Sequence, residues 1–314
     1  KTINISDYSF SPDESKLFFS TESEHIYRRS SVETNYVYDL KTGKTSPLSD
    51  NGKQMFATFS PVGNKVAFVR DNNLFIKNFD NGKEIKITHD GKNNEIKNGW
   101  ADWVYEEEFS KANYFEWNAD GSKLAFVRFD ESKVKEYTFD TYNNNLYPDK
   151  VTFKYPKAGE KNSTVSLHIY DLAKNSTKQV NLSNYSDFYI ARIKWTNDAN
   201  VFSVQVLNRH QDNLDLLFVD SNLASYKIVL NEKDNAYVDV TDNLTFLKDN
   251  SFIWTSEKDG FNHIYHYDAT GKLKKQITKG EWVVRNVVNV NEEKRTIIFA
   301  ASEIGRASCR ERVS

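Results

Sequence analysis

Three consecutive carboxylates, Glu106 to Glu108, directly follow the aromatic stretch Gly99-Trp100-Ala101-Asp102-Trp103-Val104-Tyr105. Adjacent carboxylates repel each other, and the repulsion falls only when one takes up a proton or a cation lies between them. An ammonium group would relieve it, because each carboxylate would accept a charge-assisted hydrogen bond. These residues are therefore a candidate binding site for an amine.

The backbone that carries the acidic run decides whether its side chains can converge. In a β-strand, Glu107 and Glu108 would point to opposite faces of the sheet, so a turn or a short helix must position them. A competing interpretation is that the run opens a helix, where the dipole favours acids, and faces water. Charged residues are mostly exposed, which favours that interpretation on charge alone. The flanking aromatic residues favour a walled pocket instead.

The segment Asp102–Glu108, Asp-Trp-Val-Tyr-Glu-Glu-Glu, resembles the double-glutamate motif of the dipeptidyl peptidase IV family, serine exopeptidases that remove N-terminal dipeptides. Other segments that resemble family sequence, in the family's order, are Phe59–Gly63, Tyr155–Gly159 and Lys279–Trp282. The resemblance runs from about Asp7 to Ala301. It is to the β-propeller half of such an enzyme, which has eight blades in the family, and not to the hydrolase half.

Repetition along the chain predicts the same fold class, an all-β propeller. An aromatic or apolar anchor, a turn and an alternating apolar run recur about six times, as in propeller blades. The anchors of these units are Phe10, Phe59, Trp117, Trp195, Phe246 and Val287. Two of the spacings exceed the roughly 40–50 residues of a blade. They predict an inserted loop at about 92–113, which carries the glutamates, and an arm or long hairpin at about 131–161.

We expect two regions in the chain: a partial β-propeller domain over residues 1–302 and a tail over residues 303–314. The tail breaks the strand pattern abruptly and resembles the translation of a sequencing adapter, so we interpret it as non-native. Cys309, the only cysteine, lies in it. Some of the six blade-like units are incomplete, which indicates a truncated propeller.

The family resemblance implies roles for particular residues. Glu107 and Glu108 would bind the free α-ammonium of a peptide substrate, and Glu106 would be structural or solvated. Arg28 falls where the family carries an arginine near the substrate carbonyl and the glutamates, although its surroundings differ and the assignment could move to Arg29. Trp100, Trp103 and Tyr105 are expected to pack and hold the loop rather than to contact a ligand.

Composition and spacing argue against several other functions. The net charge is −2, with Lys and Arg scattered among acids, so we expect no nucleic-acid partner. We expect no metal and no cofactor. The histidines are dispersed, with His263 and His266 on opposite faces of a strand, and Asp102 with the acidic run lacks the spacing of a calcium loop. No Gly-x-Ser-x-Gly elbow is present, so no catalytic triad is assigned in this chain.

The resulting interpretation is the substrate-gating, N-terminus-recognising propeller of a serine exopeptidase that releases Xaa-Pro or Xaa-Ala dipeptides. The fragment alone would be inactive. The resemblance implies peptides with a free N-terminus and a C-terminal α/β-hydrolase domain as partners, a homodimer as a candidate assembly, and a periplasmic, outer-membrane-associated or secreted location in a bacterium. The alternative is a stand-alone propeller that binds a protein or glycan without catalysis. A family member with an inactive hydrolase half is a third interpretation.

Overall fold

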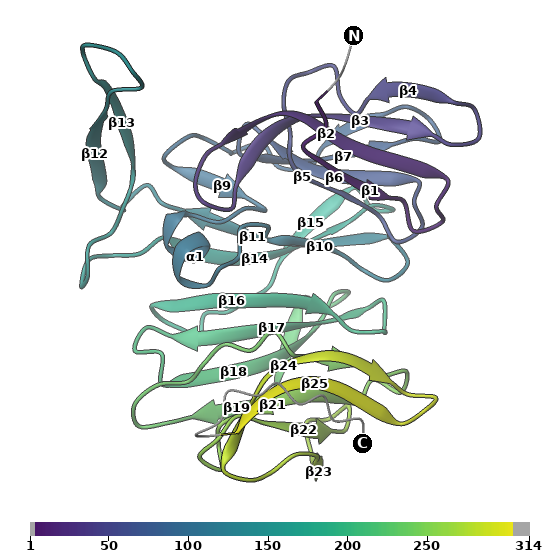
Figure 1. The fold of residues 1–314 in the computed structure, drawn as a ribbon, viewed down its shortest axis with the longest axis vertical. Helices are drawn as coiled ribbons and strands as arrows, with labels where there is room; N and C mark the ends of the chain where they lie inside the picture. Colours follow the sequence, from purple (N-terminus) through teal and green to yellow (C-terminus); the bar gives the residue numbers. More distant parts are fainter. Residues whose placement is uncertain (1–3, 304–314) are drawn as a thin grey trace. The chain divides into compact units, whose positions relative to one another are not determined.

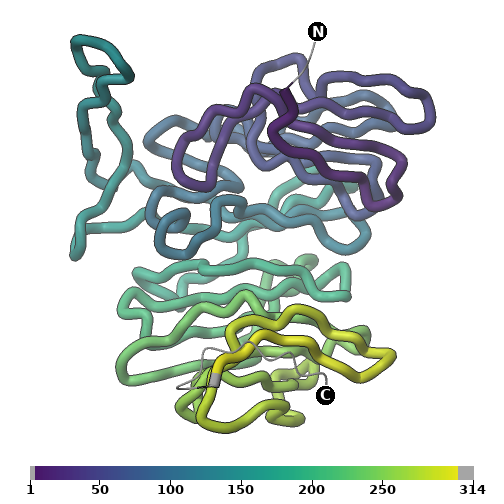
Figure 2. The backbone as a smooth tube through the Cα atoms, viewed as in Figure 1, coloured from purple at the N-terminus to yellow at the C-terminus, as the bar shows by residue number. Residues whose placement is uncertain are grey.

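The computed structural model describes residues 4–303 of the chain. Packing divides the chain into two compact units, which meet in sequence at Leu182 and Ser183. Antiparallel β-sheets make up almost all of both units, and the described residues contain one α-helix, α1 (Trp103–Glu108). Figure 1 and Figure 2 show the sheets as successive segments of the chain. No helix among residues 4–303 has the length and apolar character needed to span a membrane.

The first unit contains three sheets and a separate hairpin. The strands of the first sheet are β1 (Asp7–Phe10), β2 (Lys16–His25), β3 (Ser31–Asp39) and β4 (Lys44–Pro47). Those of the second are β5 (Met55–Phe59), β6 (Lys65–Arg70), β7 (Asn73–Asn78) and β8 (Glu84–Lys86). The third is formed by β9 (Ile96–Asn98), β10 (Phe115–Trp117), β11 (Lys123–Asp130), β14 (Thr164–Asp171) and β15 (Ser176–Gln179). Apart from β9, each strand pairs with its neighbour in sequence within the sheet.

The hairpin is the predicted arm. β12 (Glu136–Thr141) and β13 (Asp149–Lys154) pair only with each other, and they stand out from the three sheets of this unit (Figure 1). Its exposed apolar side chains are Tyr137, Phe139, Tyr142, Leu146, Tyr147 and Val151. Both strands lie within residues 131–161, for which the sequence predicts an extended arm or long hairpin.

The second unit continues the same pattern. Its strands are β16 (Phe188–Trp195), β17 (Val201–Asn208), β18 (Asn213–Asp220), β19 (Ser225–Lys233), β20 (Thr245–Phe246), β21 (Phe252–Ser256), β22 (His263–Tyr267), β23 (Leu273–Gln276), β24 (Trp282–Asn291) and β25 (Thr296–Glu303). They form two four-stranded sheets and the pair β24–β25. Residues 4–303 therefore contain six consecutive sheets besides the arm, which agrees with the six blade-like units. β25 ends at Glu303, and residues 304–314 of the predicted tail lie outside the described residues.

Neighbouring sheets within a unit pack face to face, which explains the apolar runs in their inner strands. Phe18 and Val37 of the first sheet share a core with Val66, Phe68 and Phe75 of the second. A larger core joins the second and third sheets, and a third core joins β21 and β22 to β24 and β25. Burial of this apolar surface is the main favourable contribution to folding. The outer strands β4 and β15 are exposed, and their sequences are accordingly polar.

A half-buried histidine in the third sheet makes stability depend on pH. His168 on β14 stacks on Phe126 with ring centroids 5.2 Å apart, and its Nε2 lies 2.8 Å from the hydroxyl of Ser166. Burial, assisted by the charge of Arg128, lowers the pKa of His168 from 6.5 to about 4. The unfolded chain therefore binds more protons than the folded chain between these two pH values.

We expect this histidine to destabilise the fold progressively as the pH falls from 6.5 towards 4. The lowered pKa corresponds to at most ~3 kcal/mol of unfolding free energy. The variant His168→Gln should lose that part of the pH dependence in urea unfolding measured at pH 7 and pH 4.5. The matched change at the exposed His25 should leave the wild-type dependence intact. An unchanged pH slope in His168→Gln would contradict the prediction.

Candidate functional site

The glutamates lie in a loop whose two ends are held together by backbone hydrogen bonds. The amide of Tyr114 donates to the carbonyl of Gly99 at 2.9 Å, and the amide of Ala101 donates to the carbonyl of Ala112 at 2.8 Å. Gly99 has a φ of +76°, and a Cβ there would lie 2.8 Å from a methyl of Leu74, so this turn requires glycine. The indole of Trp100 donates to Asn72 at 3.1 Å. The loop is thereby fixed to the second and third sheets.

Helix α1 begins inside this loop because Asp102 caps it. The Asp102 side chain accepts from the amide of Tyr105 at 2.9 Å, the interaction that makes aspartate a favoured N-cap. Its other oxygen accepts from the hydroxyl of Ser163 at 2.5 Å, which lies beyond the arm in sequence. Burial raises the pKa of Asp102, and the hydrogen bonds from Ser163 and Tyr105 offset only part of the rise. Asp102 thus has a structural role in the site.

Tyr105 anchors the helix in an aromatic core. Its ring packs edge-on against Phe109, Tyr114 and Phe129, with centroids 4.8–5.5 Å away. Tyr105 and Trp100 are buried, which agrees with their predicted packing role, while Trp103 is half-buried against Tyr155. The prediction of a short helical segment for the acidic run is therefore confirmed. Glu106 lies in the first turn of the helix, whereas Glu107 and Glu108 form its C-terminal end, and the dipole at a helix C-terminus disfavours negative charge.

The three glutamates differ in their surroundings. Glu106 is fully buried, and its Oε1 accepts from the backbone amide of Arg29, whereas its Oε2 has no hydrogen-bond partner within residues 4–303. Glu106 is structural, one of the two roles that the sequence left open. The Glu107 side chain is 21% exposed, and Glu108 is exposed with no hydrogen bond or ion pair to another described residue. Glu107 and Glu108 are therefore the acids whose side chains can reach a ligand.

Arg28 lies beside Glu107, although 79 residues separate them in sequence. Its Nε donates to Oε1 at 3.1 Å and to Oε2 at 2.9 Å. The Arg28 side chain is 70% exposed, so this ion pair adds at most ~1 kcal/mol to stability. The neighbouring Arg29 points elsewhere, and its guanidinium donates to the hydroxyl of Ser110 at 3.0 Å. The structure thus brings Arg28, and not the guanidinium of Arg29, to the glutamates.

Arg28 is carried by the turn between β2 and β3 of the first sheet. The amide of Ile26 donates to the carbonyl of Ser30 at 2.9 Å, and the amide of Tyr27 donates to the Ser30 hydroxyl at 3.2 Å. Together with the amide bond from Arg29 to Glu106, these contacts hold the turn against α1. The candidate site is therefore assembled from two loops of the first unit and contains the exposed carboxylate of Glu108, the partly exposed carboxylate of Glu107 and the exposed guanidinium of Arg28.

A buried ion pair beneath this site was missed in the sequence. Nζ of Lys97, on β9, lies 3.1 Å from Oε2 of Glu131, and the two side chains are 2% and 1% exposed. Burial raises the pKa of Glu131, and the ammonium of Lys97 offsets only part of that rise. β9 itself was also missed, because it is a three-residue strand within the predicted loop. Lys97 lies in the polar stretch Lys92–Gly99, so the sequence offered no signal that its side chain is buried.

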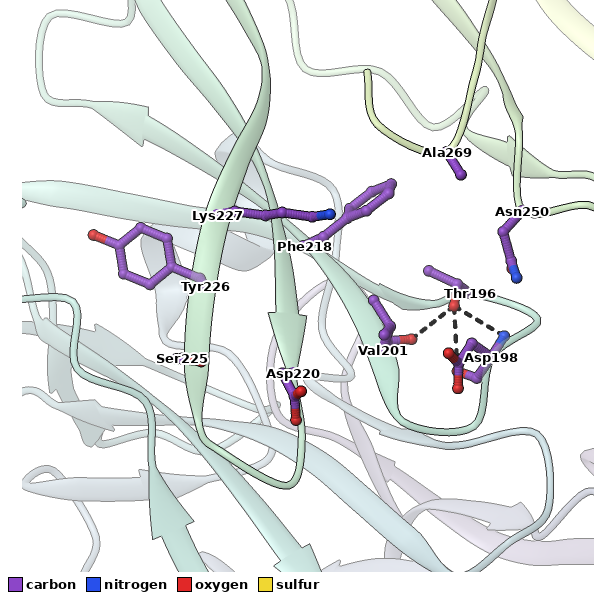
Figure 3. Close-up of a pocket in the computed structure, with 10 residues that line it drawn as sticks. All are labelled: Thr196, Asp198, Val201, Phe218, Asp220, Ser225, Tyr226, Lys227, Asn250 and Ala269. Atoms are coloured by element: carbon purple, nitrogen blue, oxygen red, sulfur yellow. Dashed lines mark hydrogen bonds between the residues drawn. The ribbon is translucent and has the colours of Figure 1, made fainter. Parts of the chain in front are cut away.

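The second unit contains a pocket of about 430 Å³ that the sequence analysis did not indicate. Figure 3 shows Phe218 and the aliphatic part of Lys227 on one side of it, and Asn250 on another. The carboxylates of Asp198 and Asp220 accept hydrogen bonds from backbone amides of their own turns. Within residues 4–303, no group of three or more His, Cys, Asp or Glu side chains is placed to hold a metal ion.

Comparison with known proteins identifies the family. The model of the dipeptidyl peptidase IV N-terminal region matches residues 11–312. The chain belongs to the dipeptidyl peptidase IV family. A dipeptidyl peptidase 4 of Trichophyton rubrum is 31% identical to it over 95% of the chain and 40% of the relative's length. The chain thus spans about two fifths of the curated relatives that it matches.

Solved structures of the family share the fold of this chain. The crystal structure of Porphyromonas gingivalis dipeptidyl peptidase 4 superposes with a TM-score of 0.93 at 41% identity, over 99% of this chain and 46% of that one. A structure from Bacteroides ovatus superposes with a TM-score of 0.71 at 23% identity, over 91% of this chain and 41% of that one, which shows the fold alone. The chain is therefore an N-terminal β-propeller region of this family.

The cap residue Asp102 provides a test of how the site is held. Asp102→Ala removes the acceptor for Tyr105 and Ser163, so we expect a loss of ~1–3 kcal/mol in unfolding free energy. Hydrogen exchange of the amides in residues 103–109 should accelerate in the same variant. Asp102→Asn keeps an acceptor for Tyr105 and serves as the matched control. Equal protection in all three proteins would rule out the capping role.

Proposed function

We propose that this chain is the peptide-recognising region of a dipeptidyl peptidase IV-like serine exopeptidase, in which Glu107 and Glu108 bind the free α-ammonium of the substrate. The contact between Arg28 and Glu107 carries the proposal. It joins two distant loops beside the exposed carboxylate of Glu108, at the positions where the sequence resembles the family's substrate-binding residues. A pair of accessible acids with one adjacent guanidinium is suited to a ligand that bears both an amine and a carbonyl.

The charges of the site favour an ammonium ligand. An ammonium has three donors, and a carboxylate has about four acceptor positions, so Glu107 has capacity for a ligand while it accepts from Arg28. The helix C-terminus also attracts positive charge. The guanidinium keeps further N–H donors, because only Nε is used on Glu107, and these are available to a substrate carbonyl.

Fixing the amine would also determine which bond is cut. If the amino group is held at the glutamates, the peptide bond that reaches a nucleophile is set by distance, and orientation of this kind can supply much of a barrier reduction. The nucleophile would belong to a C-terminal α/β-hydrolase domain of the parent protein, since no nucleophile elbow occurs in this chain. We therefore propose that the chain alone does not hydrolyse peptides.

Several further parts of the proposal are based on membership of the dipeptidyl peptidase IV family. The propeller would admit peptide ends and exclude folded proteins, and the released dipeptides would be Xaa-Pro or Xaa-Ala. The parent enzyme would be exported by a bacterium. The exposed apolar side chains of the arm support a homodimer, because large exposed apolar patches mark interaction surfaces.

The proposal is tested with the full-length protein that contains this chain, assayed on Gly-Pro and Ala-Pro chromogenic dipeptides. Glu107→Gln and Glu108→Gln should each lower kcat/KM by ~10- to 100-fold, because each removes a charge-assisted hydrogen bond to the ammonium. The double variant should lose more than either single variant. Glu14→Gln, at an exposed turn of the first sheet, is the control and should retain wild-type turnover.

A second measurement separates amine recognition from general damage. Acetylation of the substrate's amino group should abolish turnover by the wild-type protein, and circular dichroism should show that the glutamine variants are folded. Full turnover in the folded double variant would exclude the ammonium-binding role of these glutamates. Absence of any hydrolase activity in the wild-type protein would leave the non-catalytic binding propeller as the better interpretation.

A further inference from the structure

Two aromatic contacts join the base of the arm to the two halves of the site. Phe153 on β13 packs on Tyr27, with ring centroids 5.9 Å apart, and Tyr27 directly precedes Arg28. Tyr155, which follows β13, packs on Trp103, the first residue of α1, with centroids 4.3 Å apart. The arginine loop and the glutamate helix thus rest on the same short segment of the arm. A displacement of this segment would therefore disturb a contact of each.

The buried side chain of Lys97 contacts both the arginine loop and the glutamate loop. Its Nζ lies 4.3 Å from the ring centroid of Trp100, 5.1 Å from that of Tyr27 and 3.5 Å from the Tyr27 hydroxyl. Glu131, its ion-pair partner, lies where the arm begins, and the amide of Glu131 donates to the carbonyl of Glu95 at 2.8 Å. Lys97 therefore links the start of the arm to the aromatic residues beneath Arg28.

The energetics indicate that this ion pair does more than stabilise the fold. Removal of water from both charges costs several kcal/mol each, so a buried pair is often no more stable than well-packed apolar residues of similar volume. A cation over an aromatic face, in contrast, imposes a defined geometry on the rings. Lys97 has two such faces, on Tyr27 and Trp100, besides the carboxylate of Glu131.

We infer that Lys97 and Phe153 are positioning residues, which set the place of Arg28 relative to Glu107 and so couple the position of the arm to peptide binding. This inference rests on the proposed function, because the bound group is the substrate ammonium. The exposed pair of Arg28 and Glu107 is weak by itself, so its geometry depends on the aromatic support under Tyr27. A change at the arm base should alter binding of the peptide more than the chemical step.

The test uses two variants of the full-length protein. Lys97→Met/Glu131→Leu replaces the buried pair by apolar side chains of similar volume, which leaves no unpaired charge and should preserve the fold. Phe153→Leu removes the ring that supports Tyr27 without touching the pair. Each variant should raise KM for the Ala-Pro chromogenic dipeptide by ~10-fold, which is the effect expected when about one hydrogen bond to the substrate is lost. We expect kcat to stay within twofold of wild type. The control is Leu223→Ala at an exposed turn of the second unit, which should change neither constant.

Hydrogen exchange provides a readout that needs no substrate. In both variants the amides of residues 26–30, including the Arg29 amide that donates to Glu106, should exchange faster than in the wild type, while those of β16 and β17 should be unaffected. If the double variant fails to fold, Phe153→Leu alone is used to test the inference. Unchanged KM and unchanged exchange in a folded variant would overturn the inference.

The two proposals can fail separately. If Glu107→Gln leaves kcat/KM unchanged, the ammonium-binding role fails, and the exchange measurement still decides whether the arm base positions the Arg28 loop. If Glu107→Gln lowers kcat/KM while Lys97→Met/Glu131→Leu and Phe153→Leu leave KM unchanged, the glutamates keep their role and only the coupling is refuted. A fall in kcat with constant KM in the Lys97 or Phe153 variants would also refute the coupling, because the residues at the arm base would then act on the chemical step.

Discussion

Concentrated negative charge at the end of a six-residue helix is the constraint on which the rest of the first unit depends. A helix this short is not stable in isolation, since nucleation is unfavourable and few hydrogen bonds repay it. Glu107 and Glu108 at its C-terminal end oppose the dipole as well. The surroundings compensate: Asp102 caps the first turn, Tyr105 anchors the helix in aromatic residues, and Arg28 approaches Glu107. Asp102 and Tyr105 belong to the glutamate loop itself, whereas Arg28 is brought by the turn between β2 and β3.

The same constraint explains why the support beneath the site is both aromatic and charged. Tyr27 and Trp100 stack with ring centroids 6.4 Å apart, and Lys97 lies against both rings. Aromatic rings fill space rigidly with few rotatable bonds, which suits a surface that must hold two loops in register. A purely aliphatic support would bury similar area without fixing orientation. Buried polar groups are not confined to this place: Arg70, 8% exposed, lies over the rings of Phe68 and Phe75 in the core between the first two sheets.

Much of this architecture could be predicted from the sequence because it depends on local patterns. The hairpin units follow from apolar alternation and turns, the arm from an excess of residues between two repeats, and the helical turn from the geometry that paired acids need. The choice between Arg28 and Arg29 could not be made, because it depends on a contact across 79 residues. Lys97 and Glu131 were missed for the same reason. Their pairing follows from β9 joining β11 in the third sheet, and a three-residue strand has almost no sequence signature.

The pairing register of the arm limits where its length can vary. β12 and β13 pair from Glu136 with Lys154 to Thr141 with Asp149, and side chains alternate between the two faces of the ribbon. A one-residue insertion between Asp149 and Phe153 would turn Phe153 to the opposite face and separate it from Tyr27. An insertion in the connecting residues 142–148 would change only the length of an exposed loop, at small entropic cost. Natural variation in arm length within this family should therefore be confined to the connecting loop, with the strands constant in length.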